Sequence, residues 1–124
     1  MLFTTYISNI KNIPEEFHKN IIIIARYFKS DKFKKDIRLC PSDWLLKSYK
    51  SCEISWEEFE SEFKKQMNTG TTLQAMRELY RRLKNGEDII LVCYEKDDTQ
   101  CHRRLIREFL SQWIKAKEYT EGDL

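Results

Sequence analysis

Three short apolar runs along the chain have the composition of β-strands. The first, residues 2–7 (LFTTYI), is rich in the β-branched and aromatic residues that favour strands. The runs at 20–26 (NIIIIAR) and 88–94 (DIILVCY) are apolar without alternation. Because alternation is lost when both faces of a strand are buried, we expect these two strands to lie in a parallel sheet that helices cover on both sides.

Longer segments with apolar residues at helical spacing separate the second and third runs. Ser55 and Glu58 form a capping-box pattern, which predicts a helix that extends to about Met67. A second such pattern at 71–74 (TTLQ) predicts another helix, which Asn85 and the following glycine should end.

Two further helices are predicted, one before and one after this pair. Residues 41–43 (PSD) should cap a short helix over 44–46. The last helix should start near Cys101, with Asp98 or Thr99 as its cap. Its apolar residues form a single inward stripe of Leu105, Ile106, Phe109, Leu110, Trp113 and Ile114.

Strands that alternate with helices predict the α/β class of fold. We expect a small, mostly parallel sheet with helices on both faces, a three-layer sandwich of the Rossmann-like or flavodoxin-like type. Residues 1–118 should form this single α/β domain, and the polar C-terminal tail 119–124 should fray. Ligands bind such sheets beyond the carboxyl ends of the strands, so the functional residues are expected there.

Composition and charge narrow the class of protein. With 41% hydrophobic and 34% charged residues, the 124-residue chain should be globular, and its net charge of +2 does not by itself indicate a nucleic-acid binder. The longest apolar run, 21–25, is too short to span a membrane, and the N-terminus lacks a signal-peptide pattern. We therefore expect a cytoplasmic protein without membrane contact, whose four cysteines are reduced thiols unless one pair does redox work.

Residues 91–109 concentrate most of the reactive side chains of the chain. The third predicted strand ends at Cys93, and Glu95 follows it closely. Arg26 and Tyr27 follow the second strand in the same way. If these strands are parallel, the groups share one edge of the sheet, which is a common place for a ligand pocket.

The directions of three consecutive side chains follow from the geometry of the last helix. At about 100° per residue, His102 falls inside the apolar stripe, Arg103 falls on its edge and Arg104 falls on the opposite face. We therefore expect His102 to face the sheet, Arg103 to border the site and Arg104 to face solvent. The positive end of the helix dipole would also lower the pKa of Cys101.

Nucleophilic thiol chemistry is the first functional interpretation of this segment. Cys93 or Cys101 would attack, His102 would activate the thiol, and an arginine with the helix amides would hold an oxyanion or phosphate. The loops of cysteine phosphatases and rhodaneses also place a cysteine after a strand and an arginine at the following helix. The residue six positions after Cys93 is Thr99 and the loop lacks glycines, so we reject those families.

Other interpretations stay open beside it. Cys93, Cys101 and His102 are possible zinc ligands, but the adjacency of the last two hinders joint chelation, and we predict no metal site. Residues 26–38 hold six basic residues against two acidic ones with aromatic residues interleaved, a pattern of either a nucleic-acid-binding module or a solvated loop. The cysteines are equally typical of core residues in a structural or partner-binding domain.

Several stretches resemble one family. Residues 91–110 (LVCYEKDDTQCHRRLIREFL) are similar to its signature of a strand, Cys-x-Glu-Lys, a short acidic loop and Cys-His-Arg. Residues 22–27 (IIIARY) and 40–63 are similar to its second-strand motif and middle segment. On these motifs the chain resembles the domain of unknown function 488 family, which implies a small α/β protein with no settled activity. The motif positions carried over are Arg26, Cys93, Glu95, Lys96, Cys101, His102 and Arg103.

The residues and the resemblance together predict a pocket at the strand C-termini that binds a small anionic or nucleotide-like ligand. The candidate catalytic residues of a possible cysteine-dependent enzyme are Cys93, Cys101, His102 and Glu95. The candidate ligand-binding residues are Arg26, Tyr27, Lys96 and Arg103.

Overall fold

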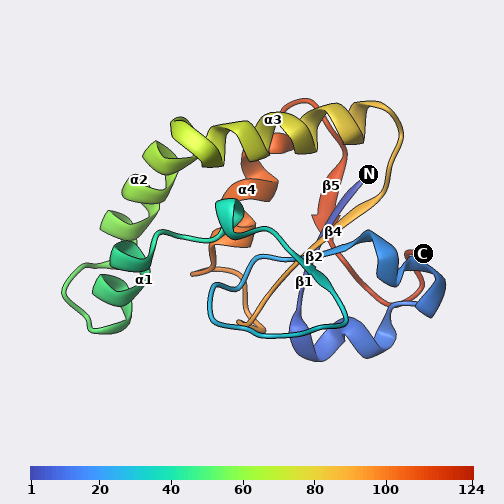
Figure 1. The fold of residues 1–124 in the computed structure, drawn as a ribbon, viewed down its shortest axis with the longest axis horizontal. Coiled ribbons are helices and arrows are strands. Elements are labelled where there is room, and N and C mark those ends of the chain that lie inside the picture. Colours follow the sequence, from blue (N-terminus) through green and yellow to red (C-terminus); the bar gives the residue numbers. More distant parts are fainter.

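Five parallel strands form the sheet of the computed structural model, which describes residues 1–124 (Figure 1). The strands are β1 (Leu2–Tyr6), β2 (Ile21–Ile23), β3 (Lys34–Lys35), β4 (Ile89–Cys93) and β5 (Ala116–Glu118). Their order across the sheet is β3-β2-β4-β1-β5. The predicted α/β sandwich is confirmed, and its sheet is parallel throughout.

The three predicted strands form the centre of this sheet. β4 lies between β1 and β2, with Cys93 opposite Tyr6 in the register. Within β4, Leu91 packs into the core on one face of the sheet, whereas Ile90 and Val92 pack into the core on the other. Burial on both faces therefore explains why these runs are apolar without alternation.

The two edge strands were not predicted. β3 has only two residues, both exposed, and β5 has three, none of them fully buried. Each pairs with one neighbour only. Strands of this length and polarity carry no periodic signal, so only the pairing with the rest of the sheet reveals them.

Four α-helices cover one face of the sheet, and 3-10 helices cover the other (Figure 1). The α-helices are α1 (Asp43–Lys50), α2 (Trp56–Met67), α3 (Gly70–Lys84) and α4 (His102–Leu110). The 3-10 helices on the opposite face are η1 (Ile7–Asn12) and η2 (Glu15–Asn20), while η3 (Ile37–Leu39) contacts α3. None of the helices is both long enough and apolar enough to cross a membrane.

The helix caps agree only in part with the sequence patterns. Ser42 caps α1, and the predicted capping box of Ser55 and Glu58 opens α2. The box predicted at 71–74 is wrong, because α3 already begins at Gly70 without a side-chain cap. Thr72 is buried instead and donates its hydroxyl hydrogen to a backbone carbonyl oxygen of η3 at 2.7 Å.

The start and the end of α4 also differ from the prediction. Cys101 is the N-cap residue, and neither Asp98 nor Thr99 takes that place. The carbonyl of Asp98 accepts a hydrogen bond from the Cys101 amide at 3.2 Å, which closes a turn before the helix. The helix ends at Leu110, so Trp113 lies beyond it and is half exposed.

The last residues of the chain begin with a buried side chain. Tyr119 packs edge-on against Phe3, with 5.8 Å between the ring centroids. Its hydroxyl donates to the carbonyl of Asn12 at 2.9 Å. The segment that was expected to fray from residue 119 therefore starts inside the core opposite the α-helices.

Candidate thiol site at the carboxyl edge of the sheet

A pocket of about 120 Å³ opens at the carboxyl edge of the sheet, where β2 and β4 end. From these strand ends it is lined by Ala25, Arg26, Tyr27, Cys93, Tyr94 and Glu95. From the start of α4 and the segment 41–59 it is lined by Gln100, Cys101, His102, Pro41, Leu46, Tyr49, Lys50, Trp56 and Phe59. This is the position at which parallel sheets bind ligands.

The pocket brings together most of the candidate residues. Six of the eight line it, namely Arg26, Tyr27, Cys93, Glu95, Cys101 and His102. The side chain of Lys96 is exposed and does not reach it, and Arg103 lies behind the cysteines. The pocket also has residues that the sequence did not indicate, chiefly Tyr49, Lys50 and Trp56 from α1 and α2.

Arg103 is the most deeply placed charged group of the molecule. It is completely buried, whereas the helical spacing put it only at the edge of the apolar stripe. Its Nη1 lies 2.9 Å from Cys93 Sγ and 3.6 Å from Cys101 Sγ. The same nitrogen donates to the carbonyl of Glu95, and Nη2 donates to that of Lys96 at 3.1 Å. We refer to Cys93, Cys101 and Arg103 as the thiol site.

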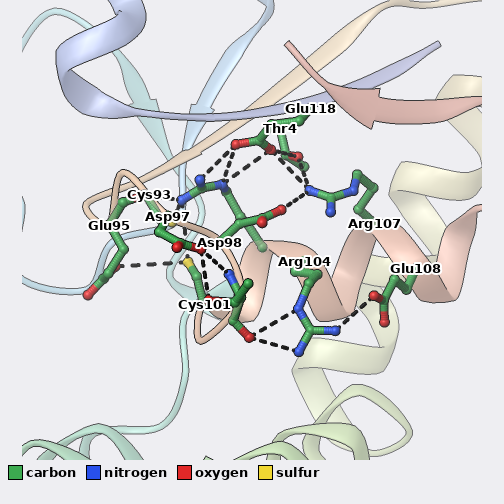
Figure 2. A network of polar contacts seen from close by, with 12 residues as sticks. Thr4, Cys93, Glu95, Asp97, Asp98, Cys101, Arg104, Arg107, Glu108 and Glu118 are labelled. Carbon is green, nitrogen blue, oxygen red and sulfur yellow. Dashed lines mark hydrogen bonds and ion pairs between the residues drawn. The ribbon is translucent and has the colours of Figure 1, made fainter.

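An ion-pair network from β5 balances the buried guanidinium (Figure 2). Glu118 accepts from Arg103 Nη2 at 2.7 Å and also from Arg107 Nη1 at 3.0 Å. Thr4 donates to Glu118 and accepts from Arg107 at 2.8 Å. A buried charge costs several kcal/mol unless it is paired and fully hydrogen-bonded, so Glu118 is a structural requirement of the thiol site.

The two sulfur atoms differ in their protonation. Burial alone would raise the pKa of Cys93, but the hydrogen bond from Cys101 and the charge of Arg103 outweigh it and lower that pKa below its usual value. The pKa of Cys101 is raised by the hydrogen bond it donates to Cys93 and by burial. The predicted low pKa of Cys101 is therefore wrong, and the lowered pKa belongs to Cys93, which lies closer to the guanidinium.

The guanidinium of Arg103 keeps its positive charge although it is buried. Burial tends to lower its pKa, but the Glu118 carboxylate and the Cys93 sulfur raise it overall. A permanent cation therefore faces the two sulfur atoms. A positive charge in this position stabilises the deprotonated form of a cysteine.

His102 faces the sheet, as its place in the apolar stripe predicted. It is almost completely buried and packs edge-on against Phe63 with 5.5 Å between ring centroids. Its Nε2 lies 2.7 Å from the carbonyl oxygen of Ile24. A carbonyl oxygen only accepts, so Nε2 carries the hydrogen. In the neutral ring Nδ1 is then an acceptor, and it points at Cys101 Sγ across 3.9 Å.

Arg104 is less exposed than its place opposite the stripe suggested. Its guanidinium donates to the Thr99 carbonyl at 2.9 Å and to Glu108 at 2.8 Å (Figure 2). It also lies over the Trp56 ring at 5.8 Å. It lines no part of the pocket, and its side chain remains 21% exposed.

The mouth of the pocket combines charged groups with exposed aromatic rings. Lys50 Nζ lies 4.0 Å from Glu95 at one side. Arg26 is held by a hydrogen bond from Nε to the Pro41 carbonyl at 2.7 Å. Tyr27 and Tyr94 are each about half exposed. These groups come from four separate segments, so only the fold brings them together.

Three side chains of the pocket have the spacing of metal ligands. The ligand atoms of Cys93, Glu95 and Cys101 all lie within 4.8 Å of one another. However, the Arg103 guanidinium already donates to both sulfur atoms. A metal ion would have to overcome this positive charge at close range, so the geometry favours thiol chemistry over metal binding.

The basic segment 26–38 has fewer free groups than its composition suggested. Phe28 packs against Tyr94 and Phe33 packs against His18, each pair with 5.6 Å between ring centroids. Arg38 forms ion pairs with Asp36 and Glu78, and the Lys35 ammonium donates to backbone carbonyls. Of the three aromatic rings of the segment, only that of Tyr27 is therefore left free to stack on bases, which weakens its interpretation as a nucleic-acid-binding module.

The fold and the site together define a small α/β protein with a paired thiol at the carboxyl edge of a parallel sheet. A family model matches residues 5–114, and the chain belongs to the DUF488-N3a family, described as the active DUF488-N3 subclade. The match confirms the resemblance drawn from the sequence motifs, and it includes both cysteines of the site. No curated protein and no solved structure matches the chain.

Proposed function

We propose that this protein is a cysteine-dependent enzyme that binds a small anionic ligand, or the anionic end of a nucleotide-like ligand, and that Cys93 is its nucleophile. The observation that carries the proposal is the 2.9 Å contact between Arg103 Nη1 and Cys93 Sγ beside the pocket. A thiolate, and not a thiol, is the nucleophilic form of cysteine. A cysteine that only filled space in the core would need no buried cation beside it.

The size of the pocket limits what it can enclose. Its volume of about 120 Å³ is well below the roughly 300–1,000 Å³ of pockets that enclose drug-sized ligands. A phosphate-sized or carboxylate-sized group therefore fits inside, whereas a whole nucleotide does not. The rest of a larger ligand would lie over the exposed rings of Tyr27 and Tyr94, which offer stacking surfaces at the mouth.

The charges around the pocket favour a negative ligand. Arg26 and Lys50 line it, and Arg103 stands behind its inner wall, against Glu95 and the Cys93 thiolate. The amino-terminal end of α4 also points its positive dipole end at the same space. Together, the two cations in the pocket lining and the helix end support the binding of a small anion.

The remaining candidate residues divide into two roles. Glu95 stands at the mouth, where it can exchange protons with water, and is the candidate acid or base for a bound ligand. His102 contacts Cys101 and the Ile24 carbonyl but has no hydrogen bond to Cys93. It therefore acts on Cys101 and does not activate the nucleophile directly.

Alkylation of each cysteine with iodoacetamide over a pH series, read by peptide mass spectrometry, tests the proposal. Cys93 should label with a midpoint below the usual thiol value of about 8.5, and millimolar phosphate or adenosine monophosphate should slow its labelling. The exposed Cys52 is the internal control, because phosphate should leave its rate unchanged. The Lys50→Met variant should weaken the protection of Cys93.

Two outcomes contradict the proposal. A labelling midpoint of Cys93 at or above that of Cys52 would contradict the proposed thiolate at Cys93. Equal labelling of Cys93 with and without phosphate or adenosine monophosphate would contradict the proposed anion-binding site.

A further inference from the structure

We infer that Cys101 is a resolving thiol, which attacks an oxidised Cys93 and closes a Cys93–Cys101 disulfide, so that the site cycles between dithiol and disulfide forms. This inference rests on the proposed nucleophilic role of Cys93 and adds an oxidation–reduction activity to the same site. It assigns a separate function to each sulfur atom.

The positions of the two sulfur atoms carry the inference. They lie within 4.8 Å of each other, and the residues are both buried, at 0% and 3% exposure. Cys93 is the last residue of β4 and Cys101 is the N-cap of α4. The segment 94–100 between them contains no helix or strand. It can therefore adjust while the sulfur atoms approach to the roughly 2.05 Å of a disulfide bond.

The surroundings of Cys101 supply what a resolving thiol needs. Because it holds its proton more tightly than Cys93, Cys101 does not compete as the first nucleophile. His102 Nδ1 lies 3.9 Å from its sulfur as an acceptor, and the bond from Nε2 to the Ile24 carbonyl fixes the ring. Glu95 Oε2 is a second acceptor at 3.9 Å. Cys101 can thus lose its proton at the moment it attacks.

The chemical steps balance with a hydroperoxide as the oxidant, and hydrogen peroxide is the simplest of this class. The Cys93 thiolate attacks one peroxide oxygen, the O–O bond breaks, and Cys93 becomes a sulfenic acid while hydroxide leaves. The Cys101 sulfur then attacks the Cys93 sulfur and the S–O bond breaks. The proton of Cys101 passes through His102 to the departing hydroxide, which leaves as water. One external thiol then opens the disulfide to a mixed disulfide, and a second external thiol releases the reduced protein and leaves as the oxidised external disulfide.

The other two cysteines of the chain lack this arrangement. Cys40 is buried and has only a weak contact with the Asp36 carbonyl at 3.7 Å. Cys52 is exposed and belongs to no cluster of potential ligand atoms. They are therefore internal references for the oxidation of the thiol site.

Oxidation of the reduced full chain with equimolar hydrogen peroxide, followed by dimedone and iodoacetamide, tests the inference by peptide mass spectrometry. The wild type should give a linked Cys93–Cys101 peptide that is lighter by two hydrogen atoms, with Cys40 and Cys52 still free. In Cys101→Ser, Cys93 should still oxidise but accumulate as the dimedone adduct. Serine is a preferred N-cap residue, so α4 should persist in this variant. Cys52→Ser is the matched control and should form the disulfide normally.

A third variant separates the two steps. His102→Gln should slow disulfide closure by about a hundredfold, as the loss of a general base does, so that the dimedone adduct of Cys93 accumulates. Equal dimedone labelling of Cys93 in wild type and Cys101→Ser would overturn the resolving role while leaving Cys93 as the nucleophile. If Cys93 reacts no faster than Cys52 with either hydrogen peroxide or iodoacetamide, the proposed function and the inference both fail.

Discussion

Cys93 and Cys40 are both completely buried, at the end of β4 and in the segment before α1 respectively. Burial dominates at Cys40 and raises its pKa to about 11. At Cys93 the same burial is outweighed by Cys101 and by the guanidinium of Arg103. Equal burial thus goes with a raised thiol pKa in one region and a lowered one in the other, and the difference lies in the groups buried with the sulfur, a second thiol and a cation.

The two regions also place different demands on the fold. The Cys40 sulfur has one weak contact with a backbone carbonyl, at 3.7 Å. The lowered pKa of Cys93 depends on a buried arginine, and that arginine is held by Glu118 and two backbone carbonyls. Substitutions in this network should therefore change both stability and thiol reactivity, whereas those near Cys40 should change stability alone.

The largest effect is expected from Arg103→Met, which should make Cys93 resemble Cys40. Removing one partner of a buried ion pair costs about 3–5 kcal/mol of unfolding free energy, and the pKa of Cys93 should rise. Urea unfolding and iodoacetamide labelling measure the two effects. Arg103→Lys keeps the positive charge and is the control if the methionine variant does not fold. An unchanged titration of Cys93 in the methionine variant would contradict the role given to Arg103.

The second effect concerns pH and has opposite signs at the two cysteines. The pKa of Cys40 is raised in the folded state, so its contribution to stability is present below the unfolded value and is lost as pH rises toward about 11. The pKa of Cys93 is lowered, so its contribution is present above the unfolded value and is lost as pH falls through the folded value.

Cys40→Ala should therefore reduce the loss of stability between pH 8 and 11 by about 2–3 kcal/mol relative to wild type. Urea unfolding at each pH, with a reductant present, measures this difference. Cys93→Ala is the matched comparison and should not reduce that loss. Parallel pH profiles for wild type and Cys40→Ala would show that Cys40 ionises normally.

A smaller effect is expected from Glu118→Gln. The amide can still accept a hydrogen bond from Arg103, so the variant should lose about 1.5 kcal/mol of unfolding free energy. The pKa of Cys93 should fall further, because a negative charge is removed while backbone carbonyls still hold the guanidinium. Labelling of Cys93 against pH checks the sign. A rise in that pKa would mean that Glu118 is needed to position Arg103.

The smallest effect is expected from Arg104→Ala. This arginine pairs with Glu108 at the surface and lies over Trp56, contacts that together contribute about 0.5–1 kcal/mol. The titration of Cys93 should not change. A shift of that titration would show that general positive charge, and not the specific contact of Arg103, sets the thiolate.

The centre of the fold could be predicted from sequence because burial leaves a direct pattern there. Apolar runs gave β1, β2 and β4, and the capping box gave α2. β3 and β5 could not be found, since two or three polar residues become strands only through their pairing with a neighbour. The start of α3 at Gly70 was likewise set by the buried hydroxyl of Thr72 and not by a cap.

The features of the candidate site that depend on local sequence patterns could be predicted, but its contacts between segments distant in the sequence could not. The ends of the predicted strands correctly put Cys93 and Glu95 at the carboxyl edge of the sheet. The helical spacing correctly predicted that His102 faces inward. The depth of Arg103 was missed because its partner Glu118 lies on an unpredicted strand. A lowered pKa was expected at Cys101 from the helix dipole alone, whereas it is found at Cys93, because the guanidinium of Arg103 lies nearer to that sulfur.

The pairing of β1 with β4 has a consequence for how the molecule reaches its native state. Leu2 is aligned with Ile89, so the central ladder of the sheet joins segments that lie far apart in the sequence. Contacts of such long sequence separation must overcome a large loop-closure entropy, and proteins rich in them fold slowly. A nascent chain on the ribosome therefore holds β1 without its partner until most of the sequence has emerged. Cys93 and Cys101 lie after Ile89, so the contact of Cys93 with Arg103 forms only after the partner strand of β1 has been synthesised.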